Sequence, residues 1–161
     1  MNERINKIIK HPKYQEWLQL NTTCEVDRSF CKHQMRHFLD TARIAYILNL
    51  EQKWNLSKEV IYAAALLHDI GRWEQYQSDI PHNESSARLC VDVLKDSDFN
   101  EEEIEAIVKA ILNHTIGPVD SGDRLSVLLF TADKKSRTCF NCDVRNECDW
   151  SHQKMNLEIH Y

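Results

Sequence analysis

Apolar residues recur at helical spacing along most of the chain, whereas the alternation of apolar and polar positions that marks a strand is missing. The pattern therefore predicts an all-α fold. One helix is expected to begin at a capping box, because Asn100 and Glu103 have the spacing of that motif. We expect helices over roughly 2–10, 12–20, 33–52, 57–70, 83–95, 100–114 and 124–137.

The helix predicted over 57–70, with Gly71 as its C-terminal stop, places ionisable side chains on the face that a globular protein buries. The residues on that face are Ile61, Ala64, Ala65, His68 and Asp69. A buried carboxylate without a partner is costly, so a cation or hydrogen-bond donors must meet Asp69 if it stays charged. His114 and Asp133 lie along the apolar faces of two later helices, so three helices present metal-capable side chains.

Each of these side chains also has an ordinary structural explanation. A histidine on an apolar face is more often a hydrogen-bonded core residue than a ligand, and Asp133 could pair with Arg72 or Arg137. Each such explanation needs its own buried partner, whereas one or two cations would satisfy all of these groups in one place. The three helix faces together therefore favour a metal site.

Composition limits the kind of protein that this chain can be. Its 161 residues, with only three glycines and three prolines, offer no evident linker, so we expect a single domain over 1–161. A formal net charge of -5 and the lack of a basic run argue against a nucleic-acid partner or an anionic membrane surface. No stretch approaches the ~20 apolar residues that span a bilayer, and the amino terminus lacks the core of a signal peptide. We therefore expect a cytoplasmic protein.

Five segments, in order, resemble the HD-domain superfamily of metal-dependent phosphohydrolases. They are HFLDTARIA from His37, HDIGR from His68, HNESSAR from His82, NHTIG around His114 and LFTADKKSR around Asp133. The resemblance covers residues from about 33 to 137, the expected metal-site core. The HT-x-G and ADK-x-x-R contexts look most like the branch that hydrolyses dinucleoside polyphosphates symmetrically.

The resemblance implies an HD-type helical bundle that holds two divalent transition-metal ions. The first ion would be bound by His37, His68, Asp69 and Asp133, and the second by a bridging Asp69 with His82 and His114. Mixed imidazole and carboxylate ligands suit iron, manganese or zinc. A metal-bound hydroxide, held in part by Asp69 as the catalytic ligand, would attack phosphorus in a nucleotide or another phosphate ester or anhydride.

Three cations near these ligands are candidates for binding the substrate phosphate, namely Arg72, Lys134 and Arg137. Each has an alternative, because Arg72 could pair with Glu74 or Asp79 and exposed lysines are usually solvated. His33 lies one helical turn before His37. It would either support the ligands, face the substrate or be a plain surface histidine.

The resemblance ends after Arg137, where a cysteine-containing tail, 138–161, begins. Cys139, Cys142 and Cys148 have C-x2-C-x5-C spacing, whose first pair is common in zinc and iron–sulfur sites. Cys31 is a better fourth ligand than Cys24, since it lies two residues before His33. A structural zinc ion, an iron–sulfur cluster and three reduced thiols all remain open.

Two rival functions fit the same residues. Some HD-type proteins use a mixed-valent di-iron centre to activate oxygen, and this chain has every ligand that such a site needs. A sensing module would instead bind nucleotide or iron without turnover, and its cysteine segment would respond to redox state or to metal. Phosphate-facing cations favour hydrolysis over oxygen activation, and an intact ligand set argues against a module without activity. A phosphohydrolase is therefore the leading prediction, with its substrate and oligomeric state left open.

Overall fold

The computed structural model describes residues 2–117, 120 and 122–161, and its described part is helical with no strand, which confirms the predicted all-α fold. The helices are α1 (Glu3–Lys10), α2 (Pro12–Cys24), α3 (Met35–Glu51), α4 (Lys58–Leu67), α5 (Arg72–Ser78), α6 (His82–Asp96), α7 (Glu101–Asn113) and α8 (Arg124–Lys135). The capping box at the start of α7 is present, with Asn100 accepting from the Glu103 N–H and Glu103 accepting in return.

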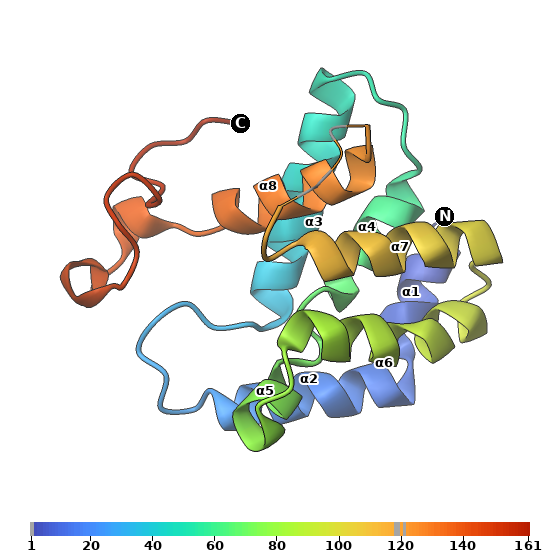
Figure 1. Ribbon diagram of the computed structural model, residues 1–161, viewed down its shortest axis with the longest axis horizontal. Helices are drawn as coiled ribbons and strands as arrows, with labels where there is room; N and C mark the ends of the chain where they lie inside the picture. Colours follow the sequence, from blue (N-terminus) through green and yellow to red (C-terminus); the bar gives the residue numbers. More distant parts are fainter. Residues whose placement is uncertain (1, 118–119, 121) are drawn as a thin grey trace.

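Helix α4 lies at the centre of the bundle, where α1, α3, α6, α7 and α8 all pack against it (Figure 1). Its sequence explains this position, because every residue from Ala63 to Leu67 is fully buried. Three successive alanines let the neighbouring helices approach closely from several sides. The C-terminal end of α4 therefore delivers the residues that follow it, His68 and Asp69, to the middle of the molecule.

Helix α4 ends at Leu67, three residues earlier than predicted, and the chain turns into the short helix α5, which the sequence pattern did not reveal. Gly71 precedes α5 with a φ of -91°, so it is not a left-handed helix stop. A Cβ atom at this position would lie 2.6 Å from both Ser85 Oγ and the Ser86 backbone nitrogen. The close approach of α6 is therefore what requires glycine.

A buried asparagine from α2 fixes the same turn. The Asn21 side-chain amide donates to the Asp69 carbonyl oxygen at 2.9 Å and accepts the Trp73 N–H at 2.8 Å. The Gly71 N–H donates to Ser86 Oγ at 2.9 Å. These bonds satisfy the backbone groups of a buried turn and tie α2, α5 and α6 together around Asp69.

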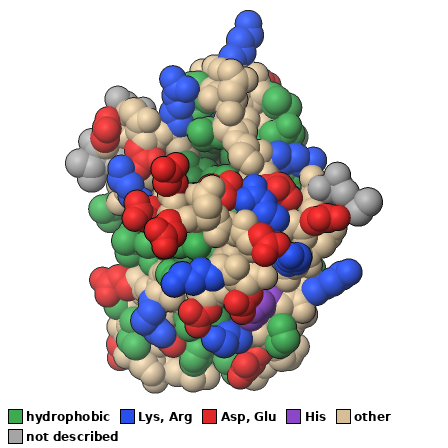
Figure 2. Space-filling model, turned by 90° about the vertical axis from the view of Figure 1, so that its right-hand side faces the viewer, with side chains coloured by type: hydrophobic (Ala, Val, Ile, Leu, Met, Phe, Trp, Pro, Cys, Tyr) green, Lys and Arg blue, Asp and Glu red, His purple; other side chains and the backbone are tan. Residues whose placement is uncertain are grey.

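The tail leaves the bundle after α8 and forms two short 3₁₀ turns, Cys139–Asn141 and Arg145–Glu147 (Figure 1). Asn156 anchors it, because its side-chain amide donates to the carbonyl oxygens of Lys134 and Arg137. The opposite face of the molecule interleaves acidic and basic side chains (Figure 2). Among the described residues, no helix combines the length and the apolar character that crossing a membrane requires.

Candidate metal centre

Six histidine and aspartate side chains, contributed by five segments of the bundle, converge beside the end of α4. His37 comes from α3, His68 and Asp69 follow α4, His82 begins α6, His114 follows α7 and Asp133 belongs to α8. Five of these residues are buried, and the His82 side chain is 12% exposed. The structure thus brings together all six residues that the sequence suggested as metal ligands.

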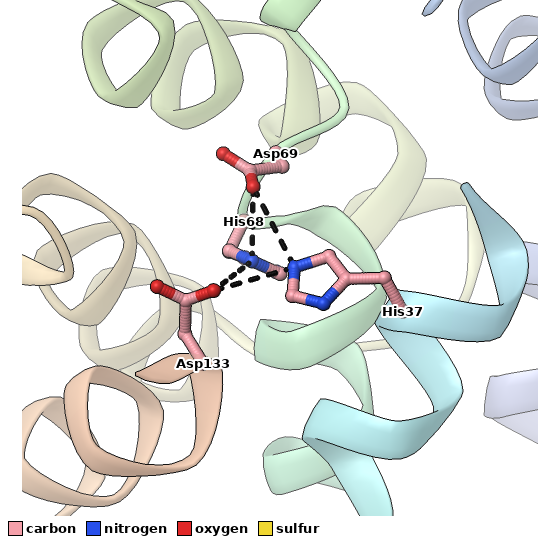
Figure 3. Close-up of side chains that lie close together, drawn as sticks. All are labelled: His37, His68, Asp69 and Asp133. Carbon is pink, nitrogen blue, oxygen red and sulfur yellow. Dashed lines mark ion pairs between the residues drawn. The ribbon is translucent and has the colours of Figure 1, made fainter. Parts of the chain in front are cut away.

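The first group consists of His37, His68, Asp69 and Asp133 (Figure 3). His68 Nε2 lies 3.3 Å from Asp69 Oδ2 and 3.6 Å from Asp133 Oδ1. His37 Nε2 lies 3.3 Å from Asp133 Oδ1 and 3.8 Å from Asp69 Oδ2. These separations exceed ordinary hydrogen bonds and suit ligands that share one ion at bonds of about 2.1 Å.

The second group consists of Asp69, His82 and His114. Asp69 Oδ1 lies 3.3 Å from His82 Nε2 and 3.4 Å from His114 Nε2, and the two nitrogens are 3.2 Å apart. The carboxylate of Asp69 is therefore divided, with Oδ2 facing the first group and Oδ1 facing the second. This is the arrangement that a bridging ligand needs.

All four imidazoles are oriented in the same way, with Nδ1 facing an oxygen atom and Nε2 facing the other ligands. For His37, His68, His82 and His114 these oxygens are Ser136 Oγ at 3.0 Å, the Ala65 carbonyl at 2.7 Å, Gln75 Oε1 at 2.7 Å and the Ile111 carbonyl at 2.6 Å. An Nδ1–H that donates to oxygen leaves the lone pair on Nε2. In the neutral form of each ring the inward-facing nitrogen is therefore an electron-pair donor, as a metal ligand must be.

The electrostatics of the centre keep both of its carboxylates ionised. Burial alone would raise the pKa of Asp69 and Asp133, yet the surrounding imidazoles, with Arg72 and Lys134, hold both pKa values well below the usual range. Burial opposes charge on His68, but Asp69 and Asp133 raise its pKa to about 9. Burial and Arg72 lower the pKa of His82 to about 3 despite the opposing effect of Asp69. Two carboxylates are thus ionised beside a neutral His82.

Several buried atoms of the centre also lack a hydrogen-bond partner among the described residues. They are His68 Nε2, Asp69 Oδ1 and Asp133 Oδ1. Buried polar atoms are normally paired, because an unpaired one costs about 1–3 kcal/mol and more when charged. Divalent metal ions would pair all of them, so the donor set fits a metal centre.

The three predicted phosphate-binding cations surround this centre. Arg72 Nε lies 3.5 Å from Asp69 Oδ1, and Arg137 Nη2 lies 3.6 Å from Asp133 Oδ1. Lys134 Nζ donates to Asp133 Oδ2 at 2.6 Å. Of the two alternative partners of Arg72 considered above, Glu74 pairs with Arg88 instead. The cations therefore face the ligands and are not dispersed in solvent.

A cavity of about 350 Å³ opens above the second group. Its lining includes the ligands Asp69, His82, His114 and Asp133. Four cationic and two aromatic side chains also line it, namely Arg28, Arg72, Lys134, Arg137, Phe30 and Trp150. We call this cavity the cleft. It combines metal-capable residues, positive charge and flat apolar surfaces.

Sequence reasoning missed a buried glutamate behind the centre. Glu25, fully buried after α2, accepts the His33 N–H at 2.6 Å and the Tyr76 hydroxyl at 2.7 Å, and also bonds His33 Nδ1. His33 Nε2 in turn lies 3.6 Å from Asp69 Oδ2. His33 is only 2% exposed, so it is not a plain surface histidine but supports Asp69. No motif around Glu25 signals this role.

The four cysteines singled out in the sequence line one further cavity of about 370 Å³. They are Cys31, Cys139, Cys142 and Cys148, and all four are free thiols in the structure. Cys31, Cys139 and Cys148 also line the cleft. The structure thus places the predicted fourth cysteine beside the other three.

Comparison with known proteins identifies the family to which this bundle belongs. A family model described as HD domain matches residues 35–138. A protein of Clostridium beijerinckii, described as an uncharacterized protein, is 42% identical over 159 residues, which cover 99% of this chain and 99% of the relative. No solved structure matches.

Proposed function

The chain belongs to the HD domain family, and on this premise we propose that it is a metal-dependent phosphohydrolase acting on a nucleotide or another small phosphate ester or anhydride. The observation that carries the proposal is the divided carboxylate of Asp69 at the floor of a cationic cleft. A carboxylate that faces two separate histidine groups is suited to two neighbouring ions.

Each group of ligands would hold one ion. His37, His68, Asp69 and Asp133 would hold the first, and Asp69 with His82 and His114 would hold the second. When bound, such ions supply Lewis-acid chemistry and activate water for attack on phosphorus. The oxygens that face Nδ1 of each histidine keep its Nε2 lone pair directed inward, so the rings need no reorientation to bind.

The cations would receive the phosphate. Arg72 and Arg137 lie on either side of the ligands, and each guanidinium has more N–H donors than its contacts to Asp69 and Asp133 use. Lys134 is fixed by Asp133 and by the His114 carbonyl oxygen, which accepts at 3.1 Å. Fixed positive charge at this position would offset the negative charge that accumulates on the phosphoryl oxygens during displacement.

The aromatic side chains of the cleft support a nucleotide substrate. Phe30 and Trp150 line the same cavity as the cations, so a base could stack on one of them while its phosphates reach the centre. The HT-x-G and ADK-x-x-R contexts around His114 and Asp133 favour a dinucleoside polyphosphate within this class. An oxygenase would have no need of the four cations that line this cleft.

The test is a hydrolysis screen on protein purified without oxygen and loaded separately with iron, manganese or zinc. Nucleoside mono-, di- and triphosphates, dinucleoside polyphosphates and a simple aryl phosphate form the panel. We expect metal-dependent release of phosphate or nucleotide, abolished by Asp69→Asn, which also loses bound metal. Asp92→Asn, an exposed position on α6, is the matched control and should keep both. Oxygen consumption by the di-iron form without hydrolysis of any substrate would refute the proposal.

A further inference from the structure

The cysteine-lined cavity is separate from the histidine and aspartate ligands, although it borders the cleft. Three of its cysteines come from the tail, and Cys31 comes from the segment between α2 and α3. These two segments are over 100 residues apart in sequence, yet both lie on the same side of the bundle (Figure 1). The remaining cysteines, Cys24 and Cys90, do not line the cavity. The cavity therefore gathers the cysteines with metal-site spacing and leaves the others out.

All four thiols line the same cavity, so a single bound group could contact each of them. Cys139 is 8% exposed and is the one buried side chain in the tail, 138–161. Four neighbouring thiols around a cavity are a donor set that selects zinc or an iron–sulfur cluster, because soft thiolates bind both strongly.

The spacing of the sulfurs favours the larger of these two groups. A tetrahedral zinc ion with Zn–S bonds of about 2.3 Å holds its sulfurs less than ~4 Å apart. Over the described chain, no three of these sulfurs lie within 4.8 Å of one another, unlike the donor atoms of the histidine and aspartate groups. An iron–sulfur cluster places inorganic sulfide and several iron atoms between its cysteines, and so suits a wider ring around a cavity.

The tail needs such a cross-link more than the rest of the chain does. It has two 3₁₀ turns and one buried side chain, so little apolar burial holds it to the bundle. Yet Cys139, Cys148 and Trp150 from this tail form part of the cleft. A metal group that binds only the folded arrangement would supply the missing stabilisation.

We propose that Cys31, Cys139, Cys142 and Cys148 bind an iron–sulfur cluster, which fixes the tail against the segment before α3 and thereby completes one wall of the cleft. The cluster site is distinct from the histidine and aspartate centre and does not depend on the hydrolase function proposed above. Its role is structural, and no electron transfer is required of it.

The test is reconstitution of the full-length protein with ferric iron, a thiol reductant and sulfide in the absence of oxygen. We expect acid-labile sulfide in the parent, together with visible absorption that dithionite bleaches. Cys142→Ser and Cys31→Ser should lose both signals, whereas Cys24→Ser, a half-buried cysteine outside the cavity, should keep them. A parent without sulfide after reconstitution, or with zinc and no sulfide, would overturn the proposal, and a cluster retained in Cys31→Ser would overturn the assignment of the fourth ligand.

Limited proteolysis reports on the structural role and guards against misfolding of the variants. The tail of Cys142→Ser should be cleaved faster than that of the parent, while its helical circular dichroism and its manganese binding at the histidine and aspartate centre stay unchanged. Equal cleavage rates in the cluster-loaded parent and Cys142→Ser would refute the role in fixing the tail. Loss of manganese binding in Cys142→Ser would refute the separation of the two sites. Proteolysis of Cys31→Ser, which alters the segment before α3, tests the same role independently.

Discussion

His82 Nε2 and His114 Nε2 lie 3.2 Å apart, although the other nitrogen of each ring already faces an oxygen acceptor. Both inward-facing nitrogens therefore carry lone pairs, and two lone pairs at this distance repel unless a cation lies between or beside them. Asp69 Oδ1 completes the set at 3.3 and 3.4 Å. This relationship indicates a cation site at the floor of the cleft.

Replacing His82 or His114 with alanine should remove the second ion and leave the first, because neither side chain belongs to the group of His37, His68, Asp69 and Asp133. In manganese-loaded protein, the metal content should fall from about two ions per chain to about one. Elemental analysis after gel filtration measures this directly. His152→Ala, in the exposed tail, is the control and should keep both ions. Two ions retained in both variants would show that the second group is not a metal site.

Arg72→Ala and Arg137→Ala should keep their metal but slow hydrolysis by about 10- to 1,000-fold, the scale for removing one electrostatic contact to a transition state. Each guanidinium lies within 3.6 Å of a ligand carboxylate, so it can reach a phosphate bound at the same ions. Lysine at either position should recover part of the rate, since it restores the charge without the planar donors. Unchanged kinetics in the alanine variants would show that both arginines balance the charge of the ligand carboxylates and do not contact the substrate.

Gly71→Ala should destabilise the protein by about 1–3 kcal/mol, the usual cost of forcing extra volume into a packed interior. The new Cβ would meet the Ser86 backbone nitrogen at 2.6 Å, so α6 must move and carry His82 with it. We expect a lower midpoint of thermal unfolding together with weaker binding of the second ion. Gly122→Ala, where the nearest atoms belong to the Asp120 side chain at 3.2 Å or more, should have little effect on either. A midpoint unchanged in Gly71→Ala would contradict the packing argument.

Glu25→Gln tests the buried pair behind Asp69. Burial opposes ionisation of Glu25, but bonds from His33 and Tyr76 lower its pKa from 4.5 to about 2. A carboxylate whose pKa is depressed in the folded state stabilises the protein above its unfolded pKa, and this contribution disappears as the pH falls toward the folded pKa. The difference in free energy of unfolding between parent and Glu25→Gln should therefore be largest above pH 4.5 and should shrink toward pH 2.

Urea unfolding of metal-free protein across this pH range measures that difference without a contribution from metal release. His33 should add a pH dependence of the same sign. Burial lowers its pKa to about 4, so protonation of the buried ring destabilises the folded protein as the pH falls. A difference in free energy of unfolding between parent and Glu25→Gln that stays constant with pH would show that Glu25 contributes by packing alone.

The sequence by itself determined the helices and the order of the ligands along the chain. Helical periodicity is a local property, so the apolar stripes predicted the α-helices, and the capping box marked the start of α7 at Asn100. Ionisable residues on buried faces, such as His68 and Asp69, also indicated a buried polar centre before any contact was known. Short α5 escaped prediction because none of its residues is buried, so it leaves no apolar stripe.

Only the tertiary structure decided which partner each polar group found. The resemblance implied that Asp69 bridges two groups, but which of its oxygens faces which group depends on the packing of five segments. The bonds of Glu25 to His33 and Tyr76 were not indicated by the sequence at all. Periodicity shows which face of a helix is buried, but the atoms that meet on that face depend on how all the neighbouring helices pack. The turn after α4 is an example. The Asn21 amide from α2 and the close approach of α6 at Gly71 fix this turn, which orients Asp69, and neither contact is visible in the sequence of α4.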